Sequence, residues 1–441
     1  MSFVLRIFGQ PLDGPSRAAI VRRVVALFGL ALIATTWRLW TPQHVFPQVP
    51  LLGLAQHAPA WCDWLGAAGM VGGLIVALLW PAQRRASDAG LVVFAASTAL
   101  MAVLDQGRLQ PWAYQLALMA MVLVLAEPRW ALALLRLFVV SFYFHSALSK
   151  FDYTFLHTLG QQFLAALAGV VGLSLDAWGD GTRLAAALVF PAAELAVAVG
   201  LCFKPTRIAA LWCAVTLHVL LLVILGPFGL NHKPGVLVWN LFFIVQDLVL
   251  FAGGARWFGS TPPATDVPPA VPRRAVALVA AAVLLPFLAP TTWFDAWPAW
   301  ALYAPSAERV TLLIHRRAVG ELPERLLTYV EEPDDAGDPW QRVRLDRWAL
   351  EARGAPIYPQ NRYQLGVARE IVARYAPTHR ARVIRFGMAD RFSGERETEL
   401  FSGLAQLATA ADEYYLGSAG RQGMFRPEAD FNRPPPATKT Q

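Results

Sequence analysis

Long apolar runs fill the first two thirds of the chain, whereas the last third alternates apolar and polar positions. A helix needs about 20 apolar residues to cross roughly 30 Å of hydrocarbon, because lipid offers its backbone no hydrogen-bond partner. Nine stretches meet or approach this length, with the third and fourth the shortest: 22–40, 61–80, 89–105, 111–126, 130–149, 183–203, 206–226, 235–255 and 273–291. The pattern predicts an all-α polytopic membrane bundle of about nine transmembrane helices.

Two connections between the predicted spans differ from the others. Residues 260–272 read STPPATDVPPAVP, a Pro-rich linker that has too few large apolar side chains to form a core. The loop over 150–182 contains an apolar run, 162–175, that is too short to cross a bilayer. We expect this run to form an interfacial or re-entrant helix at one end of the bundle.

Beyond residue 295 the pattern becomes that of a small α/β unit. Residues 309–316, 341–347 and 381–387 alternate as strands do, while 362–375 and 398–415 have helical spacing, with Asn361 as the expected N-cap. We therefore predict a transmembrane domain over 1–295 and a small C-terminal α/β soluble domain over 296–425. Residues 426–441 contain three consecutive prolines, and we expect a disordered Pro-rich tail.

Composition supports this division. Apolar residues make up 56% of the 441 and charged residues 16%, against roughly 25% charged in soluble domains. Residues 1–295 contain 30 charged side chains, whereas the 146 residues that follow contain 39. A charge at bilayer depth costs roughly 2.5–3.5 kcal/mol, which accounts for their scarcity in the first part. An ordinary soluble enzyme is excluded.

Charge and cysteine content exclude further classes. The net charge of +7 is not concentrated on the soluble domain, so nothing indicates a nucleic-acid partner. The three cysteines, Cys62, Cys202 and Cys213, form no C-x-x-C pair. The sequence therefore predicts neither a disulfide framework nor a metal site.

The Lys and Arg residues of short loops predict the orientation, because they are retained on the cytoplasmic side. With the N-terminus inside, twelve lie on inner flanks (Arg6, Arg17, Arg22, Arg23, Arg84, Arg85, Arg129, Lys204, Arg207, Arg256, Arg273 and Arg274) and five on outer flanks (Arg38, Arg108, Lys150, Arg183 and Lys233). The first run has no clear small-residue cleavage site, which favours an uncleaved span. We predict a multi-pass protein of the cell membrane, with a cytoplasmic N-terminus and an extracytoplasmic C-terminal domain. An eight-span or ten-span count would place that domain inside.

Polar side chains within the predicted spans are candidate functional residues, because ionisable groups are costly there. Glu194, His218 and Asp247 fall near the middle of the sixth, seventh and eighth spans, and Asn240 lies closer to the outside. If these helices pack together, the four side chains form one buried cluster. Two interpretations remain open: a functional site, or hydrogen bonds that merely hold the helices to one another.

The end of the fifth span is the most informative stretch, and it reads FYFHSALSKFD over 142–152. Ser146 and Lys150 share a helical face, whereas His145 lies about 140° from Lys150 on an ideal helix. In an apolar cavity Lys150 would favour its neutral form and act as a base, although a nearby Asp152 would favour the ammonium. The alternative is an interfacial lysine that extends to the lipid headgroups.

This stretch, with Gly160, Glu194, the KPTR turn at 204–207, His218, Gly226 and Phe228, resembles the HTTM superfamily, which includes the vitamin K-dependent γ-glutamyl carboxylases. It is also similar to the broader group of DoxX and MauE membrane proteins. The resemblance covers about 130–250. This chain has Ser149 before Lys150 where the carboxylases have paired lysines, and Phe155 and His157 where they have Trp. Its C-terminal domain is also much smaller.

The carboxylase resemblance implies that Lys150 deprotonates reduced vitamin K, with a secreted or periplasmic polypeptide as second substrate. The leading hypothesis is a lipid-quinone-dependent enzyme with Lys150 as base, in which His145, Glu194 and His218 support the reaction. Ser146, Asn240 and Asp247 then bind the cofactor, reduced vitamin K or another quinone. Two alternatives stay open: a quinone-linked redox protein like DoxX and MauE, and a non-enzymatic membrane anchor or partner-binding protein.

Overall fold

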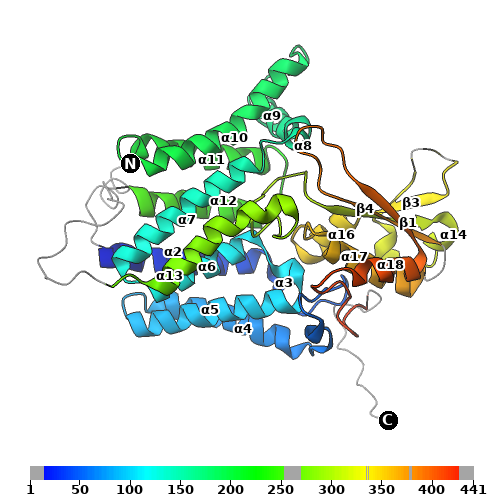
Figure 1. Ribbon diagram of the computed structural model, residues 1–441, viewed down its shortest axis with the longest axis horizontal. Helices are drawn as coiled ribbons and strands as arrows, with labels where there is room; N and C mark the ends of the chain where they lie inside the picture. Colours follow the sequence, from blue (N-terminus) through cyan, green and yellow to red (C-terminus); the bar gives the residue numbers. More distant parts are fainter. Residues whose placement is uncertain (1–13, 253–269, 334, 336, 377–379, 427–441) are drawn as a thin grey trace, which may run out of the picture.

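A computed structural model describes residues 14–252, 270–333, 335, 337–376 and 380–426. A bundle of helices forms one part of the molecule, and a small antiparallel sheet with its own helices is attached to one end of that bundle (Figure 1). We call these parts the bundle and the C-terminal unit. Most of the predicted 260–272 linker and all but the first residue of the predicted 426–441 tail lie outside the described residues.

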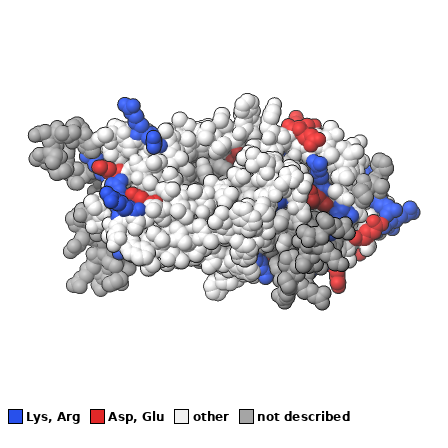
Figure 2. Space-filling model, turned by 90° about the horizontal axis from the view of Figure 1, so that it is seen from below, with Lys and Arg blue, Asp and Glu red and all other residues white. Residues whose placement is uncertain are grey.

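Eight described helices are long and apolar enough to cross a membrane. They are α2 (Gly14–Thr35), α4 (Trp61–Leu79), α5 (Arg84–Leu104), α7 (Pro128–Leu148), α10 (Asp180–Cys202), α11 (Arg207–Leu225), α12 (Pro234–Phe251), and α13 (Arg273–Leu284) continued by the 3₁₀ helix η3 (Leu285–Thr291). The remaining predicted span, 111–126, is the shorter helix α6 (Pro111–Leu125), whose 15 residues rise only about 22 Å. Few Lys, Arg, Asp or Glu side chains lie in the middle of the face seen in Figure 2, and most of those visible gather toward its two ends.

The first helix begins earlier than the predicted 22–40, and residues 37–40 form a separate short helix, α3 (Trp37–Trp40). Arg17 and Arg22, in the first turns of α2, have partners inside the bundle, so these charged turns remain helical. Arg17 Nη1 donates to the carbonyls of Val249 and Ala252 at 2.9 and 3.0 Å, at the end of α12. Arg22 pairs with Asp88 of α5 at 2.7 Å.

The loop between α7 and α10 contains two short helices, α8 (Tyr153–His157) and α9 (Leu159–Val170). The predicted run at 162–175 therefore forms a helix over its first part. The helix starts earlier and ends at Val170, before exposed Val171. Gly160 allows α9 to approach α10 closely, since a Cβ there would lie 3.2 Å from that of Ala187.

The C-terminal unit is built on a five-stranded antiparallel sheet of order β2-β3-β1-β4-β5. The strands are β1 (Arg309–His315), β2 (Val330–Glu331), β3 (Trp340–Val343), β4 (Ala381–Phe386) and β5 (Thr398–Ser402). The helices are α14 (Arg316–Val319), α15 (Glu324–Leu327), α16 (Leu345–Arg353), α17 (Asn361–Tyr375) and α18 (Gly403–Asp412). The predicted strands at 309–316 and 381–387 and the helix at 362–375 are confirmed within one residue at each end.

Three local predictions in this unit are wrong. The strand expected at 341–347 ends at Val343, because α16 starts at Leu345. The helix expected at 398–415 begins with strand β5, which pairs with β4, and Gly403 with φ 75° makes the turn into α18. The N-cap of α17 is Gln360, since the amide of Asn361 instead donates to the carbonyl of Phe386 at 3.1 Å.

Buried aromatic and ionic contacts join the bundle to the C-terminal unit. Phe46, from the connection between α3 and α4, packs on Trp348 of α16 with ring centroids 4.5 Å apart. Asp63 of α4 is fully buried and pairs with Arg421 at 2.8 Å and with Arg108 of the 3₁₀ helix η2 (Gln106–Arg108). The two parts therefore share a core as well as a covalent connection. A second 3₁₀ helix, η1 (Gly53–His57), lies in the same connection as Phe46.

Candidate functional site

The last turns of α7 present three polar side chains to the bundle interior. Tyr143, Ser146 and Lys150 follow one another at spacings of three and four, so they share a helical face. Lys150 lies just past the end of the helix and is only 3% exposed. Its side chain thus points into the bundle and does not extend outward along it.

Lys150 forms a buried ion pair with Glu194 of α10. Its Nζ lies 2.9 and 2.8 Å from the two carboxylate oxygens of Glu194. It also donates to the hydroxyl of Ser146 at 2.6 Å and lies 3.2 Å from the Ser146 carbonyl. The three N–H bonds of an ammonium are therefore all directed at acceptors. This arrangement is that of a charged lysine.

Asp152 is not the carboxylate that contacts Lys150. Its Oδ1 accepts the backbone N–H of Phe155 at 3.0 Å and the hydroxyl of Thr154, so it caps α8. The partner of Lys150 is instead Glu194, which lies 44 positions further along the chain. On α10, Pro191 lies one turn before Glu194 and interrupts the regular backbone hydrogen bonds there.

A second buried cluster lies beside the first. The hydroxyl of Tyr143 is 2.7 Å from Nε2 of His218 on α11 and donates to Oδ2 of Asp247 on α12 at 2.6 Å. His218 Nδ1 lies 2.9 Å from Oδ1 of Asn240. The amide of Asn240 in turn donates to the Val236 carbonyl at 2.8 Å. Three predicted polar side chains of the spans are therefore in mutual contact, through a tyrosine that the sequence argument did not select.

The second cluster continues through two glutamines that sequence reasoning also missed. Gln246 donates to Asp247 at 3.3 Å and accepts from Gln115 of α6 at 3.2 Å. Trp239 donates to Gln115 at 2.8 Å. Neutral polar side chains in the predicted spans were the available signal, as was the position of Tyr143 on the same helical face as Lys150.

A small cavity of about 50 Å³ separates the two clusters. Its polar lining consists of Tyr143, Ser146, Lys150, Glu194, His218 and Asn240, and its aromatic lining of Phe142, Phe163, Trp239, Phe243 and Tyr303. His218 stacks on Phe243, with ring centroids 4.7 Å apart and an angle of 9° between the planes. The cavity therefore combines a buried ion pair with walls that suit a flat ring.

His145 is the predicted site residue that lies apart from the others. It is on a different face of α7, where Nε2 lies 2.9 Å from the carbonyl of Val283 and the ring contacts Phe287. The helical geometry that separates it from Lys150 by about 140° accounts for this placement. The other six predicted residues all belong to the two clusters.

A segment between η3 and β1 closes the cavity. Leu302 and Tyr303 line it, and the ring of Tyr303 packs on Phe163 at 5.4 Å. Trp300 is fully buried and packs on Phe142 at 4.8 Å. Trp300 and Tyr303 have φ angles of 61° and 54°, a region that costs side-chain-bearing residues of order 1–3 kcal/mol. We call residues 297–305 the cap.

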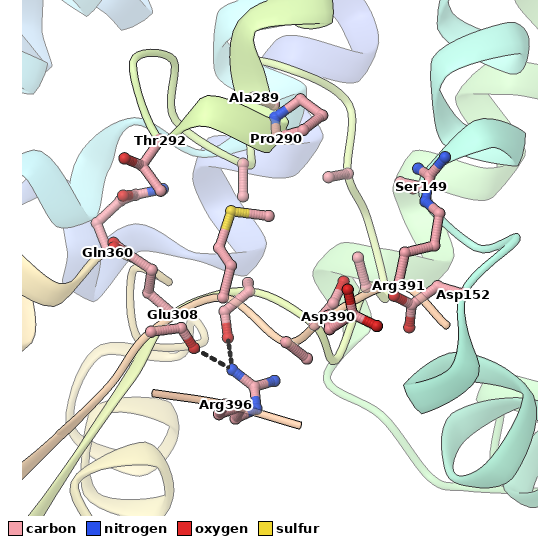
Figure 3. A pocket seen from close by; sticks show the side chains of 18 of the residues that line it. Ser149, Asp152, Ala289, Pro290, Thr292, Glu308, Gln360, Asp390, Arg391 and Arg396 are labelled. Carbon is pink, nitrogen blue, oxygen red and sulfur yellow. Dashed lines mark hydrogen bonds between the residues drawn. The ribbon is translucent and has the colours of Figure 1, made fainter. Parts of the chain in front are cut away.

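A larger pocket of about 640 Å³ lies between the end of α7, η3 and the β4–β5 loop (Figure 3). Five carboxylates line it, against two arginines: Asp152, Glu308, Asp390, Glu395 and Glu397, with Arg391 and Arg396. Arg391 donates to the Leu148 carbonyl at 3.0 Å, and Arg396 donates to those of Ala307 and Gly387. The arginines thus hold the loop in place, and the pocket is acidic.

Two carboxyl groups of this pocket have shifted pKa values. Burial raises the pKa of Glu308 above its ordinary value, and the opposing hydrogen bond from the Asn361 backbone is weaker. The backbone N–H groups of Ser393 and Phe392 lower the pKa of Asp390. In Figure 3 Glu308 lies toward Gln360, and Asp390 lies toward Arg391 and Asp152.

Within the described residues, no group of three or more His, Cys, Asp and Glu side chains is placed to hold a metal ion. Comparison with protein-family models, with curated proteins and with solved structures finds no match.

Proposed function

We propose that this protein is a membrane enzyme that binds the ring of a lipid-soluble quinone or quinol in the cavity beside Lys150. The observation that carries the proposal is the ion pair of Lys150 and Glu194, which opens onto a cavity with aromatic walls. A buried ion pair is costly to desolvate, so hydrophobic residues would serve a purely structural role equally well. The oxygen of a quinone or quinol that enters this cavity accepts from the ammonium of Lys150.

The size of the cavity implies a closed state. About 50 Å³ holds the edge of a ring, whereas pockets for whole small molecules measure roughly 300–1,000 Å³. Leu302 and Tyr303 of the cap must therefore move for a ring to enter. The strained φ angles of Trp300 and Tyr303 favour such a movement, because opening releases strain.

The resemblance to the HTTM superfamily supports a quinol as ligand, with reduced vitamin K as its best-defined example. The larger pocket argues against glutamyl carboxylation as the reaction, since its five carboxylates would repel an acidic peptide. A second substrate that enters there, such as a secreted or periplasmic polypeptide, would present basic or neutral groups. Quinone-linked redox chemistry, as in the DoxX and MauE proteins, fits this charge better.

We further propose that the protein lies in the cell membrane with the C-terminal unit outside. Loop charges support this orientation, and the first described helix begins at the end of the bundle opposite the C-terminal unit (Figure 1). A peptide tag placed after residue 441 tests it. Antibody should reach the tag on intact spheroplasts, and access only after membrane permeabilisation would reverse the orientation.

Lipid extraction and mass spectrometry of the purified protein test the ligand. We expect a naphthoquinone or another quinone to co-purify with the natural chain and to be lost from Lys150→Ala and Glu194→Gln. Lys204→Ala, at an exposed lysine between α10 and α11, is the matched control and should retain it. If the natural chain contains no quinone and added naphthoquinone does not raise its melting temperature, the bundle is better explained as a non-enzymatic anchor.

A further inference from the structure

The hydroxyl of Tyr143 connects two titratable side chains that the proposed function leaves without a role. Its oxygen lies 2.7 Å from Nε2 of His218 and 2.6 Å from Oδ2 of Asp247. Both distances lie within the ordinary range for hydrogen bonds that involve a hydroxyl. Tyr143 and His218 line the cavity, whereas Asp247 lies behind them and is fully buried.

The hydrogen-bond directions fix one proton of His218. The amide nitrogen of Asn240 donates to the Val236 carbonyl, so its oxygen is the atom that faces His218 Nδ1. An oxygen acceptor requires a donor, and Nδ1 must therefore carry hydrogen. The protonation of Nε2 then depends on the direction in which Tyr143 donates.

Two arrangements of the protons satisfy every hydrogen bond among His218, Tyr143 and Asp247. In the first, an imidazolium of His218 donates through Nε2 to the oxygen of Tyr143, whose hydroxyl donates to an ionised Asp247. In the second, Tyr143 donates to a bare Nε2 of His218, and a protonated Asp247 donates to the tyrosine oxygen. The two differ only by proton shifts along this chain, and the three side chains carry no net charge in either. Neutrality matters here because an uncompensated charge in a buried site is costly.

We propose that Tyr143 conducts the proton of a bound quinol hydroxyl to Asp247. The inference rests on the proposed function, because it requires a hydroxylated ring beside Lys150. In the first arrangement, the quinol O–H bond breaks and its proton joins the tyrosine oxygen. The former hydroxyl proton of Tyr143 passes at the same time to the carboxylate of Asp247. No electron is transferred, and no co-reactant is needed.

The charges balance across this step. Before it, the imidazolium of His218 offsets the carboxylate of Asp247, and Lys150 offsets Glu194. Afterwards Asp247 is neutral, and the quinol oxygen carries the negative charge between the ammonium of Lys150 and the imidazolium of His218. Both cations line the cavity, so they stabilise the anion as it forms.

Asp247 is a better proton acceptor than the residues of the first cluster. Lys150 as an ammonium has no lone pair to accept a proton. Glu194 already accepts from Lys150 with both oxygens, and protonation would break that pair. Asp247 has the Tyr143 hydroxyl aimed at one oxygen, and its other oxygen receives only a 3.3 Å contact from Gln246. In this assignment Lys150 stabilises the product anion, and Asp247 receives the proton.

Infrared difference spectroscopy of the full chain in lipid nanodiscs tests the assignment. The probe is a naphthohydroquinone without a side chain, added without oxygen. We expect binding to produce the C=O stretching band of a protonated carboxylic acid, with a shift in D₂O. The band should be absent in Asp247→Asn and in Tyr143→Phe, where Asp247 remains. Tyr114→Phe, at a partly buried tyrosine of α6, is the matched control and should keep the band.

Binding is measured on the same samples by the rise in melting temperature, which also identifies variants that fail to fold. The proposed proton path through Tyr143 to Asp247 is overturned if the band persists in folded Tyr143→Phe or disappears only in Glu194→Gln. Either outcome leaves quinol binding itself intact. If the natural chain does not bind the naphthohydroquinone, the proposed function fails and the inference fails with it. The two failures are therefore distinguishable.

Discussion

Lys150 and Glu194 lie 44 positions apart in the sequence and form an ion pair in which both carboxylate oxygens are within 2.9 Å of the lysine nitrogen. The side chains are 4% and 11% exposed. The pair joins the end of α7 to the middle of α10, where Pro191 interrupts the helix. The stability of the bundle and the proposed chemistry of the cavity therefore both depend on these two residues.

Removal of one member of this pair should destabilise the protein strongly. Lys150→Met leaves the carboxylate of Glu194 buried without a cation, and we expect a loss of about 3–5 kcal/mol. Lys150→Met combined with Glu194→Leu should lose much less than the sum of the single variants, because neither charge then remains. Unfolding in detergent measures all three, with Lys204→Met as control. Additive losses within about 0.5 kcal/mol would show that the pair is not coupled.

The buried aspartate between the two parts of the molecule gives a second prediction. Asp63 contacts Arg108 and Arg421, and all three side chains are almost fully buried. Asp63→Asn removes the charge that holds both arginines, so the C-terminal unit should separate from the bundle more readily. We expect faster cleavage by trypsin between the two parts and a loss of about 3–5 kcal/mol in stability.

Asp412→Asn is the control for that experiment. Asp412 is 77% exposed at the end of α18 and lies 3.8 Å from Arg369. Exposed ion pairs contribute about 0–1 kcal/mol, so this variant should behave like the natural chain. Equal protease sensitivity of the Asp63 and Asp412 variants would contradict a role of the buried network in joining the two parts.

Apolar run length was enough to predict the long helices of the bundle, because a bilayer requires about 20 apolar residues and such a run lies within one continuous stretch of sequence. Helix ends were harder to predict. The first span was predicted to start at residue 22, whereas α2 starts at Gly14. Contacts of Arg17 with the carbonyls at the end of α12 and of Arg22 with the carboxylate of Asp88 stabilise the charged turns. The ends thus depend on contacts from distant parts of the chain.

The sequence predicted most of the residues that form the two clusters, but it did not predict which of them contact each other. The cost of polar groups in lipid selected Glu194, His218, Asn240 and Asp247, but it gave no partner for any of them. Lys150 was compared with nearby Asp152, whereas the actual contact is made by a residue on another helix. Tyr143 shares a helical face with Lys150, but its contacts with His218 and Asp247 depend on the packing of three helices and could not be predicted from that spacing.

The cap supplies a prediction about access to the cavity. Tyr303 closes it with φ 54°, and its ring packs on Phe163. Tyr303→Ala removes the ring and keeps the strained positive φ that favours opening, so naphthoquinone should both enter and leave faster. We expect stopped-flow fluorescence quenching to show association at least several-fold faster than in the natural chain. Tyr415→Ala, at a fully exposed tyrosine, should leave the rate unchanged, and equal rates for both variants would contradict gating by the cap.

The larger pocket predicts a pH dependence through Glu308. Burial raises its pKa in the folded protein above the unfolded value of 4.5, so the folded state binds more protons than the unfolded state over this range. Stability from this group is present in full below pH 4.5 and is lost as the pH rises through the folded pKa. Glu308→Gln cannot ionise, and its melting temperature should fall less between pH 4.5 and 7 than that of the natural chain. Glu324→Gln, at an exposed position on α15, is the comparison, and identical pH profiles for the natural chain and Glu308→Gln would contradict the burial of this carboxyl group.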